Sequence, residues 1–133
     1  MTFVSRHISI SINKTAKQVY DFVSDPANLP QWAAGLSASI KKVGQDWIAE
    51  SPMGTVKVKF AEKNDFGILD HNVTLPSGET VYNPMRAFPN DNGCEVVFTL
   101  YKLPGVTEEQ YTQDGKLVEI DLVQLKHLME EKQ

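Results

Sequence analysis

The sequence predicts an α+β protein in which a long helix covers a curved antiparallel sheet of seven strands. From residue 36 to residue 103, segments that alternate apolar and polar residues follow one another through short turn motifs. Consecutive hairpins of this kind build an antiparallel sheet. The last segment, residues 107–131, has helical spacing instead and is the one element long enough to cover the sheet. Two short helices cannot fill the remaining concave side, so a cavity between sheet and helix is expected.

Composition limits the classes of function. A chain of 133 residues is expected to fold as one domain spanning residues 1–133. Hydrophobic residues make up 41% and charged residues 23%, as in ordinary globular proteins. The net charge of −4 comes without a basic patch, which argues against a nucleic-acid partner. No apolar run approaches the ~18 residues of a membrane span. The single cysteine, Cys94, fits a reducing compartment and predicts a cytoplasmic location.

The first third of the chain predicts one strand and two short helices. Val4–Ile12 alternates isoleucine with polar residues, which is typical of a half-buried strand. Val19–Val23 has helical spacing, and Asp25-Pro26 ends that helix. Pro26–Trp32 is interpreted as a second short turn or helix, with Leu29 and Trp32 turned inward.

The middle of the chain predicts six strands joined by hairpins. The clearest alternation runs from Thr55 to Glu62, where Val56, Val58 and Phe60 are expected inside and the lysines between them outside. Asn90–Gly93 is the strongest turn motif. The expected strands are Leu36–Val43, Trp47–Ser51, Thr55–Glu62, Ile68–Leu75, Glu79–Phe88 and Cys94–Leu103.

The final helix is expected from Thr107 to Glu131. Thr107 and Gln110 form a T-x-x-Q capping box at its start. Its C-terminal half, Leu122–Met129, should be core, and its N-terminal half, Tyr111–Val118, is the place for a lid over the pocket. The apolar stripe recurs at intervals of three and four residues and comprises Tyr111, Gly115, Val118, Leu122, Leu125 and Met129, with Asp114 and Asp121 on one flank.

The opening I-S-I-S-I-N-K-T-A-K-Q-V-Y-D-F-V-S-D-P-A-N-L-P-Q-W resembles the start of START-like (SRPBCC) proteins. D-H-N-V-T-L-P-S-G-E, P-M-R and E-V-V-F-T-L-Y are similar to stretches of the small bacterial polyketide cyclase/dehydrase-like subgroup. The resemblance covers essentially the whole chain and implies a single START-like domain with the helix-grip fold. That superfamily includes carriers, cyclases, hydrolases and protein-binding modules, so the resemblance implies the fold and leaves the function open.

Hairpin pairing predicts a cluster of polar residues on one face of the sheet. A two-residue loop at Ser77-Gly78 pairs Leu69 with Arg86, and a four-residue loop at residues 90–93 pairs Arg86 with Val97. We expect this face to point inward beside Val56, although a slip of one residue would exchange the two faces. The face carries His71, Tyr82, Arg86, Thr99 and Tyr101.

Among the candidate site residues, His71 and Arg86 could take the clearest chemical roles. His71 could act as a general acid or base, or donate a hydrogen bond to a ligand carbonyl. The alternative is a histidine whose hydrogen bonds its neighbours satisfy. Arg86 could hold a ligand carboxylate with two hydrogen bonds, or it could form a surface ion pair with Asp70 or Glu95.

Further ligand contacts are expected from the short helices and the long one. Tyr82 and Tyr111 could anchor a ligand through their hydroxyl groups or be plain core aromatics. Asp114 could reach Arg86 or His71 across the cavity, or lie on a solvated helix edge. Trp32 is expected to plug one end of the cavity, and Val118 to line it.

Three functions remain open. The first is binding of a small hydrophobic or aromatic molecule in the internal cavity. The second is a cyclase, dehydratase or hydrolase in which His71 is the acid or base and Tyr82 or Arg86 polarises a carbonyl. The third is a protein-interaction module or homodimer, through the outer face of Cys94–Leu103 or through Ile120 and Val123. The chain lacks the common cofactor and nucleophile motifs and its histidines lie on separate elements, so no cofactor and no metal are expected.

Overall fold

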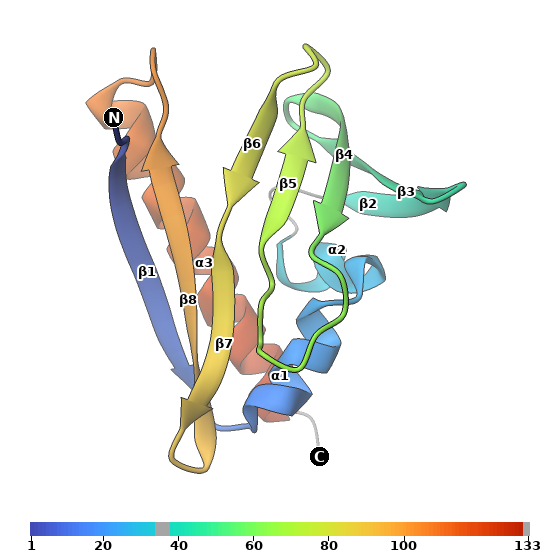
Figure 1. Ribbon diagram of the computed structural model, residues 1–133, viewed down its shortest axis with the longest axis vertical. Coiled ribbons are helices and arrows are strands. Elements are labelled where there is room, and N and C mark those ends of the chain that lie inside the picture. Colours follow the sequence, from blue (N-terminus) through green and yellow to red (C-terminus); the bar gives the residue numbers. More distant parts are fainter. Residues whose placement is uncertain (34–37, 132–133) are drawn as a thin grey trace.

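The computed structural model describes residues 1–33 and 38–131 of the chain. The first two residues of the strand predicted at Leu36–Val43 therefore lie outside the described residues. The elements, shown in Figure 1, are β1 (Val4–Ile12), α1 (Ala16–Val23), a 3₁₀ turn (Pro26–Asn28), α2 (Leu29–Trp32), β2 (Ser39–Val43), β3 (Asp46–Ser51), β4 (Gly54–Phe60), β5 (His71–Thr74), β6 (Thr80–Asn83), β7 (Met85–Asn90), β8 (Gly93–Lys102) and α3 (Glu108–Glu131).

The strands form two antiparallel sheets, so the prediction of one seven-stranded sheet is wrong. One sheet has the order β1-β8-β7 and the other the order β2-β3-β4-β5-β6. The cause is Pro84, which interrupts the strand expected at Glu79–Phe88 and has no N–H to donate to a ladder. Before Pro84, β6 pairs with β5; after Pro84, β7 pairs with β8.

Backbone hydrogen bonds still hold the two sheets together at Pro84. Leu69 N donates to Met85 O at 2.8 Å, and Ala87 N donates to Gly67 O at 2.9 Å, in the same register as the β5–β6 ladder. On the other side, Thr99 N donates to Pro84 O at 2.9 Å. The polypeptide thus passes from one sheet to the other without losing contact with either neighbour.

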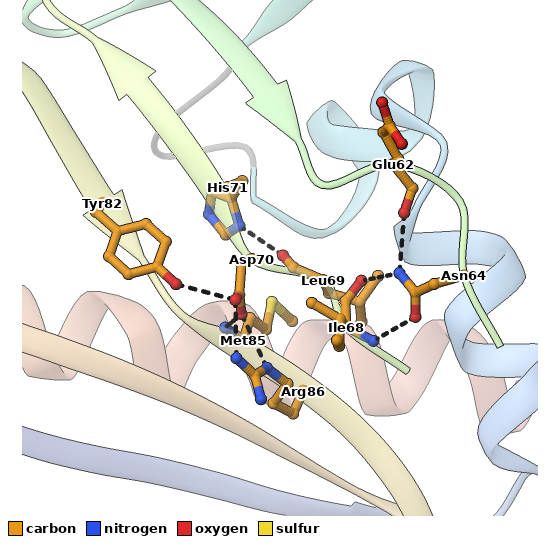
Figure 2. A network of polar contacts seen from close by, with 9 residues as sticks. All are labelled: Glu62, Asn64, Ile68, Leu69, Asp70, His71, Tyr82, Met85 and Arg86. Atoms are coloured by element: carbon orange, nitrogen blue, oxygen red, sulfur yellow. Dashed lines mark hydrogen bonds and ion pairs between the residues drawn. The ribbon is translucent and has the colours of Figure 1, made fainter. Parts of the chain in front are cut away.

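The Asp70 side chain completes this junction, as Figure 2 shows. Its carboxylate accepts a hydrogen bond from Met85 N at 2.8 Å, from Tyr82 Oη at 3.0 Å, and from Arg86 Nε and Nη2 at 3.0 and 2.8 Å. Burial by itself would raise the pKa of Asp70, but the hydrogen bonds from Arg86, Met85 and Tyr82 hold that pKa below its usual value. We call Asp70, Tyr82, Met85 N and Arg86 the Asp70 cluster.

The short helices begin with local signals and bury one face. Thr15 caps α1 through a reciprocal capping box with Gln18, and Val19 and Val23 of α1 are fully buried. In α2, Leu29 and Trp32 are buried, as predicted.

The stripe predicted on α3 is confirmed. Gly115, Leu122, Leu125 and Met129 are its buried residues. Gln110 N donates to Thr107 Oγ1 at 3.1 Å, which is one half of the predicted capping box, while the Gln110 side chain donates to Asp114 instead. The helix packs against β1, β8 and α2 (Figure 1). In the part of the chain that the structure describes, no helix combines the length and apolarity needed to cross a bilayer.

Replacing Gly67 by alanine should destabilise the fold strongly. Gly67 has φ +70°, and an added Cβ would collide with the carbonyl oxygen of Ala87. We expect the free energy of unfolding to fall by more than about 2 kcal/mol in urea denaturation. Gly78→Ala is the control, because Gly78 also has positive φ (+90°) but open space around it. The free energy of unfolding of Gly78→Ala should fall by about 1 kcal/mol. Equal decreases in the two variants would contradict the close approach of Gly67 to β7.

Removing the Asp70 carboxylate should weaken the junction between the sheets. Asp70→Ala leaves Met85 N, Tyr82 and Arg86 without their acceptor, and we expect it to lower the free energy of unfolding by about 3 kcal/mol. The control is Glu119→Ala, which removes an exposed ion pair with Arg6 and should cost less than about 1 kcal/mol. Chemical denaturation of both variants measures the difference, and a loss for Asp70→Ala no larger than the control's would count against the role of the cluster.

Candidate functional site

The inward side of the fold is fully buried at one end of α3 and only partly buried at the other. Around the C-terminal half of α3, Leu122 and Leu125 are 1% and 0% exposed. Toward its N-terminal half, inward-facing side chains of α3, β6, β8 and the end of β5 are only half-buried. We call this region the open end; Figure 1 shows these strand ends and the start of α3 at the same end of the molecule. Its half-buried residues are Leu75, Val81, Leu100, Tyr111 and Val118.

His71 lies between the packed core and the open end. It pairs with Phe60 of β4 and with Asn83 of β6, and its side chain is 4% exposed. Its ring stacks on Phe60 with centroids 4.8 Å apart, and it lies 5.9 Å from the Phe98 ring at a tilt of 60°. Of the polar and charged residues that the structure describes, His71 is the one that is buried. The prediction that it points inward is confirmed.

The hydrogen bonding of His71 fixes its tautomer. Nδ1 lies 3.0 Å from the carbonyl oxygen of Leu69, and a carbonyl oxygen can only accept, so Nδ1 carries the proton. Burial lowers the pKa of His71, against the opposing effects of the Leu69 hydrogen bond and the Asp70 charge. The ring is therefore neutral, and Nε2, which has no partner among the described residues, is a hydrogen-bond acceptor.

Tyr82 and Arg86 lie on the outer face, so their predicted place beside His71 is wrong. The loop after Leu75 has three residues instead of two, because Leu75 N donates to Glu79 O at 2.8 Å. Tyr82 consequently pairs with Asn72, one position away from the predicted partner, and its side chain changes face. Arg86 pairs with Val97 as predicted and remains on the same side as Tyr82. Both side chains are bound to Asp70, so the ion pair with Asp70 is the alternative that the structure supports for Arg86.

The other predicted site residues have local partners or pack in the core. Tyr111 Oη donates to Leu100 O at 2.8 Å, and Asp114 accepts from Gln110 Nε2 at 2.7 Å. Val118 is partly buried against the core. Trp32 is 4% exposed, and its indole N–H has no hydrogen-bond partner in the described chain. The structure thus places Tyr111 and Val118 at the open end, but it separates His71 from Tyr82 and Arg86 and ties Asp114 to its own helix.

Two polar residues of the interior were missed in the sequence. Asn83 pairs with His71 and is half-buried on the inner face, whereas the predicted register placed it on the other face. Asp121 is also half-buried, and burial raises its pKa to about 7. The helical spacing had placed Asp121 on a flank of the apolar stripe, but no role in the site was assigned to it.

Cys94, the possible metal ligands and a surface groove give less support for a functional site. Burial raises the pKa of the Cys94 thiol to about 11, which disfavours the reactive thiolate. No group of three or more His, Cys, Asp or Glu within residues 1–33 and 38–131 is arranged to hold a metal ion. A groove of about 520 Å³ lies between α1, the loop at residues 63–67 and β7, and none of the predicted site residues lines it.

No family model and no curated protein matches the chain. Solved structures do match. Protein XoxI from Bacillus cereus has a TM-score of 0.74 at 15% identity, covering 95% of each chain. The Aha1 dimer from Colwellia psychrerythraea has a TM-score of 0.72 at 16% sequence identity, and the match covers 95% of this chain and 96% of that one. Ara h 8.0201 has a TM-score of 0.67 at 12% sequence identity, and the match covers 97% of this chain and 99% of that one. Likeness at this identity shows the fold alone. The chain therefore shares the α+β fold of these structures, with antiparallel sheets and a long C-terminal helix, and this arrangement is consistent with the expected helix grip.

Proposed function

We propose that the protein binds a small hydrophobic or aromatic molecule at the open end, between the sheets and the N-terminal half of α3. One observation carries the proposal: inward-facing apolar side chains are half-buried there, while those around the other half of α3 are almost fully buried. Apolar side chains that the fold turns inward but leaves incompletely covered gain stability when a ligand covers them.

The lining favours an apolar or aromatic ligand body. Leu75, Val81, Leu100 and Val118 present aliphatic surface, and the phenol of Tyr111 is held in place by its bond to Leu100 O. Aromatic rings lie deeper, where His71 contacts Phe60 and Phe98. A mostly apolar lining with few polar groups is typical of small-molecule sites.

The proposed polar anchor is His71, and its tautomer determines which hydrogen bond it can form with a ligand. Nδ1–H is bound to Leu69 O, so the neutral ring offers the Nε2 lone pair. We therefore propose that His71 accepts a hydrogen bond from a ligand hydroxyl or N–H, and does not donate one to a carbonyl. Asn83, half-buried beside it, can serve either as donor or as acceptor.

The two alternative functions receive different support. The enzyme hypothesis needs His71 together with Tyr82 or Arg86, and those two side chains are bound to Asp70 on the outer face. The homodimer stays a prediction: Ile120 and Val123 are 62% and 44% exposed on the outer side of α3, and the similar Aha1 structure is a dimer. Light scattering of the purified protein measures its mass in solution and so tests this alternative.

Filling the open end should weaken ligand binding. Val118→Phe adds volume where the proposed ligand lies, and we expect it to raise the dissociation constant of the neutral fluorescent probe N-phenyl-1-naphthylamine about tenfold, equal to about 1.4 kcal/mol. Val123→Phe makes the same change on the exposed side of the same helix and should leave the titration unchanged. The proposal fails if the probe does not bind the native protein, or if both variants bind it as the native protein does.

His71 should make the fold less stable in mild acid. Because its folded-state pKa lies below the ordinary value of 6.5, the unfolded chain takes up the proton first. The free energy of unfolding should therefore fall as the pH drops below about 6.5 and continue to fall until the folded-state pKa is reached, by at most about 1.4 kcal/mol per pH unit. His71→Phe should remove this part of the pH dependence in urea titrations, and the exposed His127→Gln should retain it. An unchanged pH dependence in His71→Phe would show that His71 is not buried as a neutral ring.

A further inference from the structure

Two polar side chains lie side by side on the inner face, at the deep side of the open end. Asn83 of β6 is the ladder partner of His71 of β5, and partners in an antiparallel ladder share a face, with their Cβ atoms about 5 Å apart. On β6, Val81 and Asn83 are half-buried, whereas Thr80 and Tyr82 are exposed. The partly accessible inner surface of β6 therefore runs from Val81 at the open end to Asn83 beside His71.

Both side chains have hydrogen-bonding groups that the described chain does not use. The Nδ1–H of His71 is bound to Leu69 O, but Nε2 has no partner, and the Asn83 amide makes no hydrogen bond with a described residue. Across the described residues, the indole N–H of Trp32 is the side-chain polar group that is both completely buried and unpaired. Because Nε2 and the Asn83 amide are unpaired without being completely buried, both retain surface that an atom of another molecule can reach.

The outer face of the same two strands shows the opposite situation. Asp70 and Tyr82, the sequence neighbours of His71 and Asn83, are bound to each other, and Arg86 also donates to Asp70. Polar groups withdrawn from water cost free energy unless they are hydrogen-bonded. The unpaired groups on the inner face are therefore suited to a polar group that a ligand brings with it.

The directions of these two groups indicate the kind of ligand group that fits them. The neutral His71 ring carries its proton on Nδ1, so Nε2 can only accept, while Nδ2 of Asn83 can donate. Side chains on strands stand roughly perpendicular to the sheet, so the acceptor and the donor point into the interior side by side. A planar group with an N–H next to a C=O meets both of them, whereas a single oxygen atom requires the two to converge.

We propose that the ligand carries a lactam, a ring amide whose N–H donates to His71 Nε2 and whose C=O accepts from the Asn83 amide. A small ring holds the amide in the cis form, with N–H and C=O on one edge, whereas an open-chain amide is trans and points them in opposite directions. The inference rests on the proposed function, because it specifies the polar end of the molecule that the open end takes. The apolar body of the ligand lies against Val81 and the other side chains of the open end.

Three bicyclic compounds of nearly the same size test the polar end of the ligand. The lactam is 2-quinolone, coumarin has a ring oxygen in place of the N–H of 2-quinolone, and 2-naphthol carries one hydroxyl group. Isothermal titration calorimetry at about pH 8, where His71 is neutral, measures the three dissociation constants. We expect 2-quinolone to bind at least about tenfold more tightly than coumarin, because coumarin leaves Nε2 without a donor. It should also bind more tightly than 2-naphthol.

Matched variants separate the roles of the two side chains. His71→Phe keeps a ring against Phe60 but removes the acceptor, so it should abolish the preference for 2-quinolone over coumarin. Asn83→Leu removes the donor to the C=O group that both compounds share, so it should weaken both about tenfold and retain the preference. Asn72→Leu makes the same change at an exposed position of β5 and should leave all three dissociation constants unchanged. His71→Leu and Asn83→Ala take their place if either variant folds poorly.

The outcomes distinguish this inference from the proposed function. If N-phenyl-1-naphthylamine binds but the native protein binds 2-quinolone no more tightly than coumarin, the inference is overturned and the proposed site stands. The same holds if His71→Phe retains the preference, or if 2-naphthol binds more tightly than 2-quinolone, since a hydroxyl group is then the better fit. If neither N-phenyl-1-naphthylamine nor any of the three compounds binds, the proposed function itself fails.

Discussion

The arrangement of the two sheets depends on how Asp70 compensates for Pro84. Proline has no N–H to donate, so the strand that contains it cannot continue an unbroken ladder. Asp70 lies at this break and its carboxylate accepts from the next free N–H, that of Met85. The two oxygens also receive the forked guanidinium of Arg86. The chain can therefore leave one sheet and join the other while its polar groups stay satisfied.

This junction also separates the charged groups from the interior. Neighbouring residues of a strand point to opposite faces, so placing Asp70 outside places Leu69 and His71 inside. The ion pair of Asp70 with Arg86 stays partly in water, where it needs little compensation. The inner face receives an imidazole that burial keeps neutral. One alternation thus places an ion pair on the outer face and a buried imidazole on the inner face.

The long helix has two different roles along its length. Its C-terminal half contributes Leu122, Leu125 and Met129 to a closely packed core. Its N-terminal half lies over inward side chains that remain partly accessible, and Asp121, which is half-buried, stands between the two halves. One half of the helix therefore anchors the core, while the other half leaves inward side chains partly accessible, and this difference is the basis of the proposed ligand site.

The sequence by itself determined most of the elements and the buried side of β4 and α3. Those features follow from local spacing: period two in β4, which put Val56, Val58 and Phe60 inside, and the three-four spacing of α3. The inner position of His71 was expected from hairpin pairing, which left the opposite face open, and its burial confirms it. The tertiary structure decided the rest. A loop of three residues after Leu75 moved Tyr82 and Arg86 outward, because one residue changes the register of the next strand and reverses every side chain in it. The division at Pro84 depends on which strand supplies the missing hydrogen bonds. The burial of the Trp32 indole N–H without an acceptor among the described residues also depends on which parts of the chain pack around α2, and local sequence patterns do not reveal that packing.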